Sequence, residues 1–171
     1  MRIALGLIVL CIFISQPAVT EEQGFHDALL DNLAGEWLLE GTIAGAQTTH
    51  DIVAEWVLGH NYLRLYEVSR EEDDEGEPVY EAIVFIGRDQ PSGQYVCLWL
   101  DSTGGSGLSA QAFGYAKPDG DRVAFQFHDG AGGLFHTTFI YNGDSDSWEW
   151  RMDAGKEGEL APFARVSLTR K

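Results

Sequence analysis

The chain has 171 residues, enough for one domain with a sizeable core, and 44% of them are hydrophobic, which excludes a disordered polypeptide. Asp and Glu number 27 against 11 Lys and Arg, so the net charge is −16. Nucleic acids and anionic lipid surfaces select clustered Lys and Arg, and this balance argues against both as partners.

The N-terminus has the three parts of a secretory signal. Arg2 supplies a positive charge, residues 3–14 form an apolar run, and small residues follow near Ala18. The apolar run is too short for a bilayer span, which needs ~20 residues, so a permanent membrane anchor is the weaker alternative. The pattern predicts a cleaved signal peptide.

Cleavage is predicted after Ala18 or Thr20. The predicted domains are therefore a signal peptide at 1–20 and one β-barrel domain at 21–171, secreted or released into the periplasm, without a stable membrane span after cleavage.

Cleavage also decides the cysteine chemistry. Cys11 lies in the predicted signal, so the mature chain keeps Cys97 alone and cannot form an internal disulfide. Cys97 falls in mid-strand between Val96 and Leu98, and we expect a buried, unreactive thiol.

The mature chain begins with a helical pattern and continues with strand patterns. Apolar residues recur at helical spacing within 24–34, which predicts a short amphipathic helix that ends at Gly35. Segments rich in Val, Ile, Phe, Tyr and Trp then alternate with turns that contain Gly, Asp, Asn or Pro. The predicted strands are 36–43, 50–58, 61–70, 79–88, 94–101, 108–116, 122–129, 134–142, 147–153 and 162–169.

The connections between these strands are short and contain no second helix. Parallel pairing needs long crossovers, so successive strands must be antiparallel neighbours. A flat meander of about ten strands would leave two exposed edges, which closure removes. The sequence therefore predicts an all-β, about ten-stranded antiparallel up-and-down meander that closes into a lipocalin-like barrel, with the helix near one mouth. A sandwich is the alternative, and it would normally have longer Greek-key connections.

Alternation along the strands predicts which side chains face the interior. In the second strand Ile52, Ala54 and Trp56 share the inward face. In the first strand Trp37 and Leu39 share a face. The fifth strand is apolar on both faces. Either its outer face is packed against other residues, or the pattern does not decide which of its faces points inward.

The predicted barrel is wide enough to be filled by side chains or to hold one small ligand, and both alternatives stay open here. The aromatic content suits either case. Trp56, Trp99, His128 and His136 are our candidates for a ligand cavity and its rim.

His128 and His136 flank one predicted hairpin turn. If the loop is 130–133, His128 pairs with Phe135, and His136 lies opposite Phe127. The two imidazoles then point to opposite faces, which opposes joint ligation of a metal unless the register slips by one residue. Either histidine could singly ligate a haem iron, although a simple polar histidine at a strand end is the more common case.

Other motifs give no catalytic or metal site. The acidic run at 71–77 and the pair Asp144 and Asp146 lack the ligand spacing of a calcium loop. Ser106 is followed by Gly107 and Leu108, so the nucleophile elbow is incomplete. We therefore predict no catalytic residue, no metal ligand and no cofactor, and an enzyme is the less favoured class.

Three segments carry a family resemblance. Residues 33–41 (LAGEWLLEG) resemble the Leu-X-Gly-X-Trp-X-X-X-Gly opening strand of lipocalin-like barrels. Residues 55–63 (EWVLGHNYL) and 87–104, which contain Trp-X-Asp-Ser-X-Gly, are similar to signatures of a bacterial domain-of-unknown-function family with a calycin-type barrel. The resemblance implies a fold over roughly residues 33–170 and no catalytic residue.

We assign structural roles to Trp37, at the closed end of the barrel, and to Gly41 and Asp101. The opening strand is also similar to that of small haem-binding barrels related to nitrobindin, which use a proximal histidine late in the chain. The similarity does not extend to His128 or His136.

Three functional hypotheses follow. The first is an exported protein that binds a small apolar or amphipathic ligand in its barrel. The second is a haem- or metal-binding barrel with redox or isomerase activity, and the third is a barrel with a filled core that acts as a protein interaction module.

Overall fold

A computed structural model describes residues 24–105 and 107–171. The predicted signal peptide and Cys11 lie outside these residues. The elements are α1 (Ala28–Leu33), β1 (Gly35–Ile43), β2 (Ala46–Val57), β3 (Tyr62–Ser69), β4 (Glu81–Arg88), β5 (Tyr95–Asp101), the 3-10 helix η1 (Ala110–Ala112), β6 (Phe113–Ala116), β7 (Pro118–Asp119), β8 (Arg122–His128), β9 (Gly133–Asn142), β10 (Ser147–Lys156) and β11 (Glu159–Arg170).

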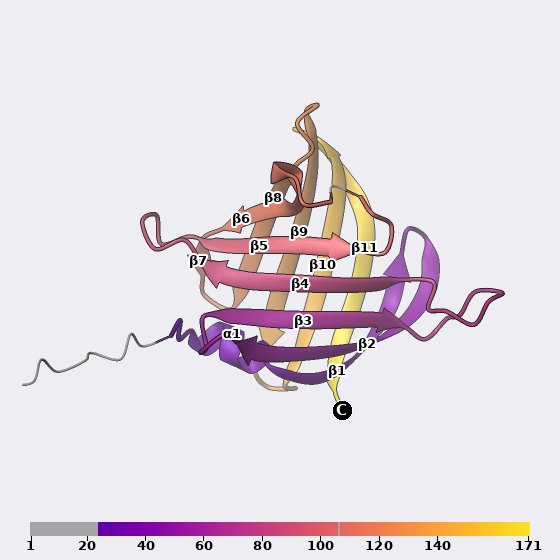
Figure 1. The fold of residues 1–171 in the computed structure, drawn as a ribbon, viewed down its shortest axis with the longest axis horizontal. Helices are drawn as coiled ribbons and strands as arrows, with labels where there is room; N and C mark the ends of the chain where they lie inside the picture. Colours follow the sequence, from indigo (N-terminus) through magenta and orange to yellow (C-terminus); the bar gives the residue numbers. More distant parts are fainter. Residues whose placement is uncertain (1–23, 106) are drawn as a thin grey trace, which may run out of the picture.

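The strands form one antiparallel sheet that closes on itself (Figure 1). Its order is β6-β5-β4-β3-β2-β1-β11-β10-β9-β8-β7, and a further bridge between Tyr115 and Gln126 joins β6 to β8. The predicted all-β antiparallel barrel with one short helix is therefore confirmed. The first and last long strands, β1 and β11, pair from Trp37 with Arg170 to Ile43 with Ala164.

The sixth strand is shorter than predicted. Residues 110–112 form the 3-10 turn η1, in which the Ala112 N–H donates to the Ser109 carbonyl. Ala and Gln have low strand propensity, and Gly107 adopts the left-handed region at φ 55°, so the chain turns before β6 begins.

Side chains predicted to face the barrel interior are buried in the structure, with the exceptions noted below. Trp37, Leu39, Ile52 and Ala54 are buried in the interior. In β5 the inward residues Tyr95 and Cys97 are also buried, whereas the alternate residues are partly exposed on the outer face. The two-sided apolar pattern of β5 thus reflects partial packing on the outer face of the barrel.

Cys97 is a free, buried cysteine, as the sequence predicts. Burial raises the pKa of its thiol well above the usual range. Within the described residues, each helix is too short or too polar to cross a bilayer.

The barrel is hollow in one half and filled in the other. Trp150 stacks on Phe139 with ring centroids 4.5 Å apart, and its indole N–H donates to the Thr137 hydroxyl at 2.5 Å. All three side chains are buried. This layer fills the middle of the barrel and separates the end under α1 from the opposite end.

Helix α1 lies across one end of the barrel (Figure 1). Asp27 caps it by accepting hydrogen bonds from the Leu29 and Leu30 N–H groups at 3.1 and 3.0 Å, so the helix begins later than the predicted residue 24. Leu30 and Leu33 are buried against the core, and the Trp37 indole donates to the Leu33 carbonyl at 2.7 Å.

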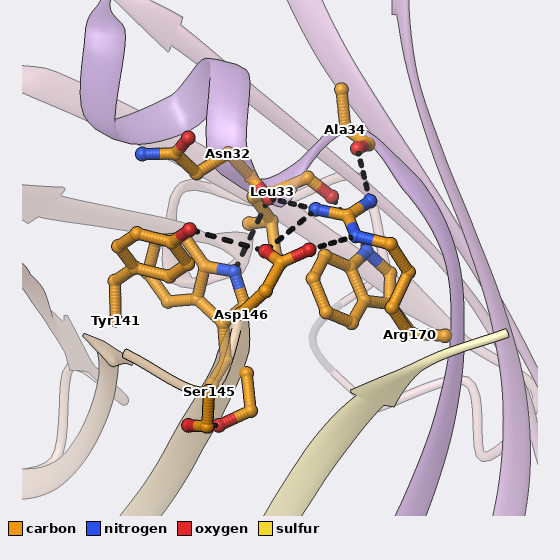
Figure 2. A network of polar contacts seen from close by, with 10 residues as sticks. Asn32, Leu33, Ala34, Tyr141, Ser145, Asp146 and Arg170 are labelled. Carbon is orange, nitrogen blue, oxygen red and sulfur yellow. Dashed lines mark hydrogen bonds and ion pairs between the residues drawn. The ribbon is translucent and has the colours of Figure 1, made fainter. Parts of the chain in front are cut away.

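Arg170, at the end of β11, fastens the C-terminal end of α1 to the barrel. Figure 2 shows its guanidinium between Asp146 and the carbonyls of Asn32 and Ala34. The Arg170 Nε lies 2.6 Å from Asp146 Oδ2, and both carbonyl contacts are 3.2 Å. The same guanidinium lies 4.1 Å from the Trp37 ring centroid. We call this end of the barrel the closed end.

Candidate functional site

A cavity of about 530 Å³ opens at the end opposite α1. This volume lies within the range of about 300–1,000 Å³ that small-molecule sites occupy. Figure 1 places the β1–β2 turn and the long loop after β3 at this end, which we call the open end. The cavity is lined by Ile43, Ala46, Thr48, His50, Glu67, Glu71, Val79, Tyr80, Trp99, Asp101, Thr103, Gly105, Gln111, Ala112, Phe127, Phe135, Met152 and Phe163.

One wall of the cavity is apolar. Phe135 packs edge-on against Phe127 and Phe163, with ring centroids 6.3 and 5.7 Å away. Met152 lies in the same wall, and Phe163 is 38% exposed. Burial of a ligand's apolar surface here would be favourable by about 25 cal/mol per Å².

The opposite wall holds a buried acid–base pair. His50 of β2 is 3% exposed and Glu67 of β3 is 2% exposed. The His50 Nδ1 lies 2.5 Å from Glu67 Oε1, and the Nε2 lies 2.7 Å from the Thr48 hydroxyl. Contacts on both ring nitrogens hold the imidazole in one orientation. The other carboxylate oxygen, Glu67 Oε2, is buried and has no hydrogen-bond partner among the described residues.

Strand alternation explains why this pair faces inward. His50 precedes Ile52 and Ala54 by two and four positions, so it shares their face. Glu67 follows Leu63 and Leu65 in the same way on β3. The strands pair with Ile52 opposite Glu67, which brings the carboxylate within reach of the neighbouring imidazole.

Tyr80 and Trp99 cover the pair. The Tyr80 ring stacks on His50 with centroids 5.6 Å apart, and the Tyr80 hydroxyl accepts a hydrogen bond from the Trp99 indole at 3.3 Å. Burial, with a smaller contribution from the negative charge of Glu67, raises the pKa of Tyr80 well above its usual range. The hydroxyl therefore keeps its proton at neutral pH.

The lining carries three acidic side chains and neither lysine nor arginine. Glu67, Glu71 and Asp101 contribute carboxylates, and neither lysine nor arginine is among the lining residues, all of which belong to the described part of the chain. Asp101 also shapes the following turn, because its Oδ1 accepts from the Thr103 N–H at 2.9 Å.

The structure places the predicted ligand residues in three regions. Trp99 lines the cavity. Trp56 lies at the closed end, where its indole donates to Asp31 at 2.9 Å and its ring stacks on His60 at 4.2 Å. His128 is exposed and His136 is half-exposed, and both alternate with the buried residues of their strands, so they lie on the outer face.

The predicted register of the β8–β9 hairpin is wrong by one residue. His128 pairs with Leu134, and His136 pairs with Gln126, so the two histidines share a face instead of opposing each other. The cause is the turn, in which Asp129 Oδ1 accepts from the Ala131 and Gly133 N–H groups at 2.7 Å each. Gly133 consequently starts β9 rather than ending the loop.

The residues assigned structural roles lie as follows. Trp37 is fully buried at the closed end. Gly41 lies where β1 approaches β11 closely, since a Cβ there would come within 2.3 Å of the Arg165 carbonyl oxygen. Asp101 belongs both to a turn and to the cavity lining.

His50, Glu67 and Tyr80 are functional candidates that we did not predict from the sequence. The signal was present for two of them, because a histidine and a glutamate stand in phase with buried residues of their strands. Among the described residues, no group of three or more His, Cys, Asp or Glu side chains is placed to hold a metal ion.

The fold is similar to that of a solved protein. The crystal structure of Rv2717c from M. tuberculosis superposes with a TM-score of 0.56 at 15% sequence identity, covering 83% of this chain and 94% of that chain. At this identity the likeness concerns the fold alone. The chain matches no known family profile, and no curated protein matches it. The barrel is therefore shown, and the bacterial lipocalin-like family stays a prediction.

Proposed function

We propose that this chain is an exported binding protein, a member of the lipocalin-like family that its motifs resemble, which holds a small amphipathic ligand in the open end of its barrel. The observation that carries the proposal is the cavity of about 530 Å³, with an apolar aromatic wall facing a buried polar pair. Such a site gains affinity from apolar burial and orientation from a few polar groups.

Export is supported by the composition of residues 1–20, with one positive charge, an apolar run and small residues. Its test is N-terminal sequencing of the protein recovered from the periplasm or medium of its host. Export predicts a mature chain that starts after Ala18 or Thr20. A full-length chain that stays in the cytoplasm would contradict it.

Ligand binding is tested with a neutral hydrophobic dye such as Nile red. We expect the wild-type protein to bind the dye, and native mass spectrometry of protein from its own host to detect a displaceable small molecule. Ala46→Trp should weaken dye binding at least tenfold, because Ala46 lies at the exposed rim of the cavity and the new indole would obstruct its opening.

Gln47→Trp is the matched control for this variant. Gln47 is the next residue on the same strand, and its side chain is exposed on the other face, where it bonds to the Thr42 hydroxyl. Dye binding should survive this substitution. Equal dye binding in both variants, or none in the wild type, would contradict a ligand site in the cavity.

A further inference from the structure

The chemistry of the polar wall indicates the class of ligand. Glu67 is 2% exposed, lines the cavity and leaves its Oε2 without a hydrogen-bond donor among the described residues. A buried carboxylate oxygen without a partner costs free energy, and a donor placed there would recover it. Because Oε2 lies just beneath the cavity surface, a ligand donor reaches it with a rotation of the Glu67 carboxylate toward the cavity.

The charges around the cavity oppose an anionic head group. Glu71 and Asp101 add two further carboxylates to the lining, and none of the lining residues is a lysine or arginine. A fatty acid would place its carboxylate among these acids without a lysine or arginine of the lining to pair with. A positively charged head group would instead be attracted by the same field.

The aromatic rings on this wall also suit a cation. Tyr80 lies stacked on His50, which contacts Glu67, and Trp99 reaches the Tyr80 hydroxyl. The faces of tyrosine and tryptophan attract ammonium groups electrostatically. The remaining lining, with Phe135 and Met152, accepts an apolar tail.

We propose, resting on the ligand site proposed above, that the natural ligand carries a protonated amine that donates a hydrogen bond to Glu67 Oε2, with its apolar part on the aromatic wall. Glu67 supplies the acceptor and the charge, and His50 positions the carboxylate through its bond to Oε1.

Displacement of Nile red by four ten-carbon probes tests this assignment. The probes are decylamine, decyltrimethylammonium, decanol and decanoate, which share a tail and differ in head group. We expect decylamine to bind at least tenfold more tightly than decyltrimethylammonium, which has the charge without an N–H, and than decanoate. A hydrogen bond to a charged group is worth roughly tenfold or more in affinity.

Glu67→Gln should weaken decylamine binding at least tenfold and leave decanol within about threefold of wild type. Glu36→Gln is the control, because it removes the same charge from an exposed side chain on β1 at the closed end. It should change neither affinity.

The outcomes separate this inference from the proposed function. If decanol and Nile red bind but decanoate or decyltrimethylammonium matches decylamine, or if Glu67→Gln binds decylamine as the wild type does, the amine assignment is overturned and the ligand site stands. If none of the four probes displaces the dye, the proposed site itself is overturned.

Discussion

The two ends of the barrel use polar groups differently. At the closed end, Arg170 pairs with Asp146 and donates to the helix carbonyls of Asn32 and Ala34, while Trp37 donates to Leu33. At the open end, Glu67 is buried more deeply than the Arg170–Asp146 pair, and one of its carboxylate oxygens has no hydrogen-bond partner among the described residues beside the cavity.

We infer from this difference that the closed end stabilises the fold and that the open end binds the ligand. Satisfied polar contacts around a filled core hold the helix and the ends of the sheet together. A buried acceptor without a hydrogen-bond donor destabilises the free protein. Such acceptors are expected at functional sites, where a ligand supplies the donor. The closed end should therefore respond to mutation through unfolding, and the open end through binding.

The largest effect is expected for Trp37→Ala. Trp37 is fully buried and loses both its packing and its bond to Leu33, so the free energy of unfolding should fall by roughly 3–5 kcal/mol. Urea unfolding followed by circular dichroism measures it. A loss below about 1 kcal/mol would show that the closed end does not anchor the fold.

Arg170→Met should cost less, about 1–2 kcal/mol, because the methionine keeps part of the apolar stem while the helix carbonyls and Asp146 lose their donor. The comparison is Arg151→Met, which breaks an exposed pair with Glu149 and should cost about 0.5 kcal/mol. Equal losses in the two variants would contradict a special role for Arg170.

Glu67→Gln should change the free energy of unfolding by less than about 1 kcal/mol. The amide loses a charged hydrogen bond to His50 but also removes the cost of burying a charged, half-satisfied carboxylate. Chemical denaturation of the ligand-free protein checks this. A loss above about 2 kcal/mol would make the open-end pair a structural element like those at the closed end.

The smallest effect concerns pH at the closed end. The hydrogen bonds from Arg170 hold the pKa of Asp146 below its usual range. A lowered pKa in the folded state contributes stability above the unfolded value of about 3.9, and the contribution is lost as the pH falls through the folded value. The difference in Tm between wild type and Asp146→Asn should therefore be present at about pH 6 and shrink below about pH 4. A Tm difference between the two proteins that does not change with pH would contradict a stabilising role for the Arg170–Asp146 ion pair.

Much of the fold could be predicted from the sequence, because it rests on local patterns. The alternation around Ile52 and the short turns determine inward faces and antiparallel neighbours. The register of the β8–β9 hairpin could not be predicted, because the Asp129 side chain decides it by binding two N–H groups of the turn.

The candidate site was predicted less well. Trp99 and Asp101 lie in the cavity lining, while His128 and His136 lie on the outer face. The same alternation extended backwards from Ile52 reaches His50, so its inward orientation follows from the local pattern. Its meeting with Glu67 depends on the pairing of β2 with β3, and the hollow beside them depends on where Trp150 fills the barrel, which no local pattern specifies.

The indole N–H signals of the chain's five tryptophans test the central claim most directly, because they report on both ends of the barrel at once. Decanol would be titrated into ¹⁵N-labelled protein while the indole resonances are followed. A ligand site at the open end predicts a large shift for Trp99, which lines the cavity, and unchanged signals for Trp37 and Trp148 at the closed end. An unmoved Trp99 at a decanol concentration that displaces Nile red, or shifts confined to Trp37 and Trp148, would contradict a ligand site at the open end.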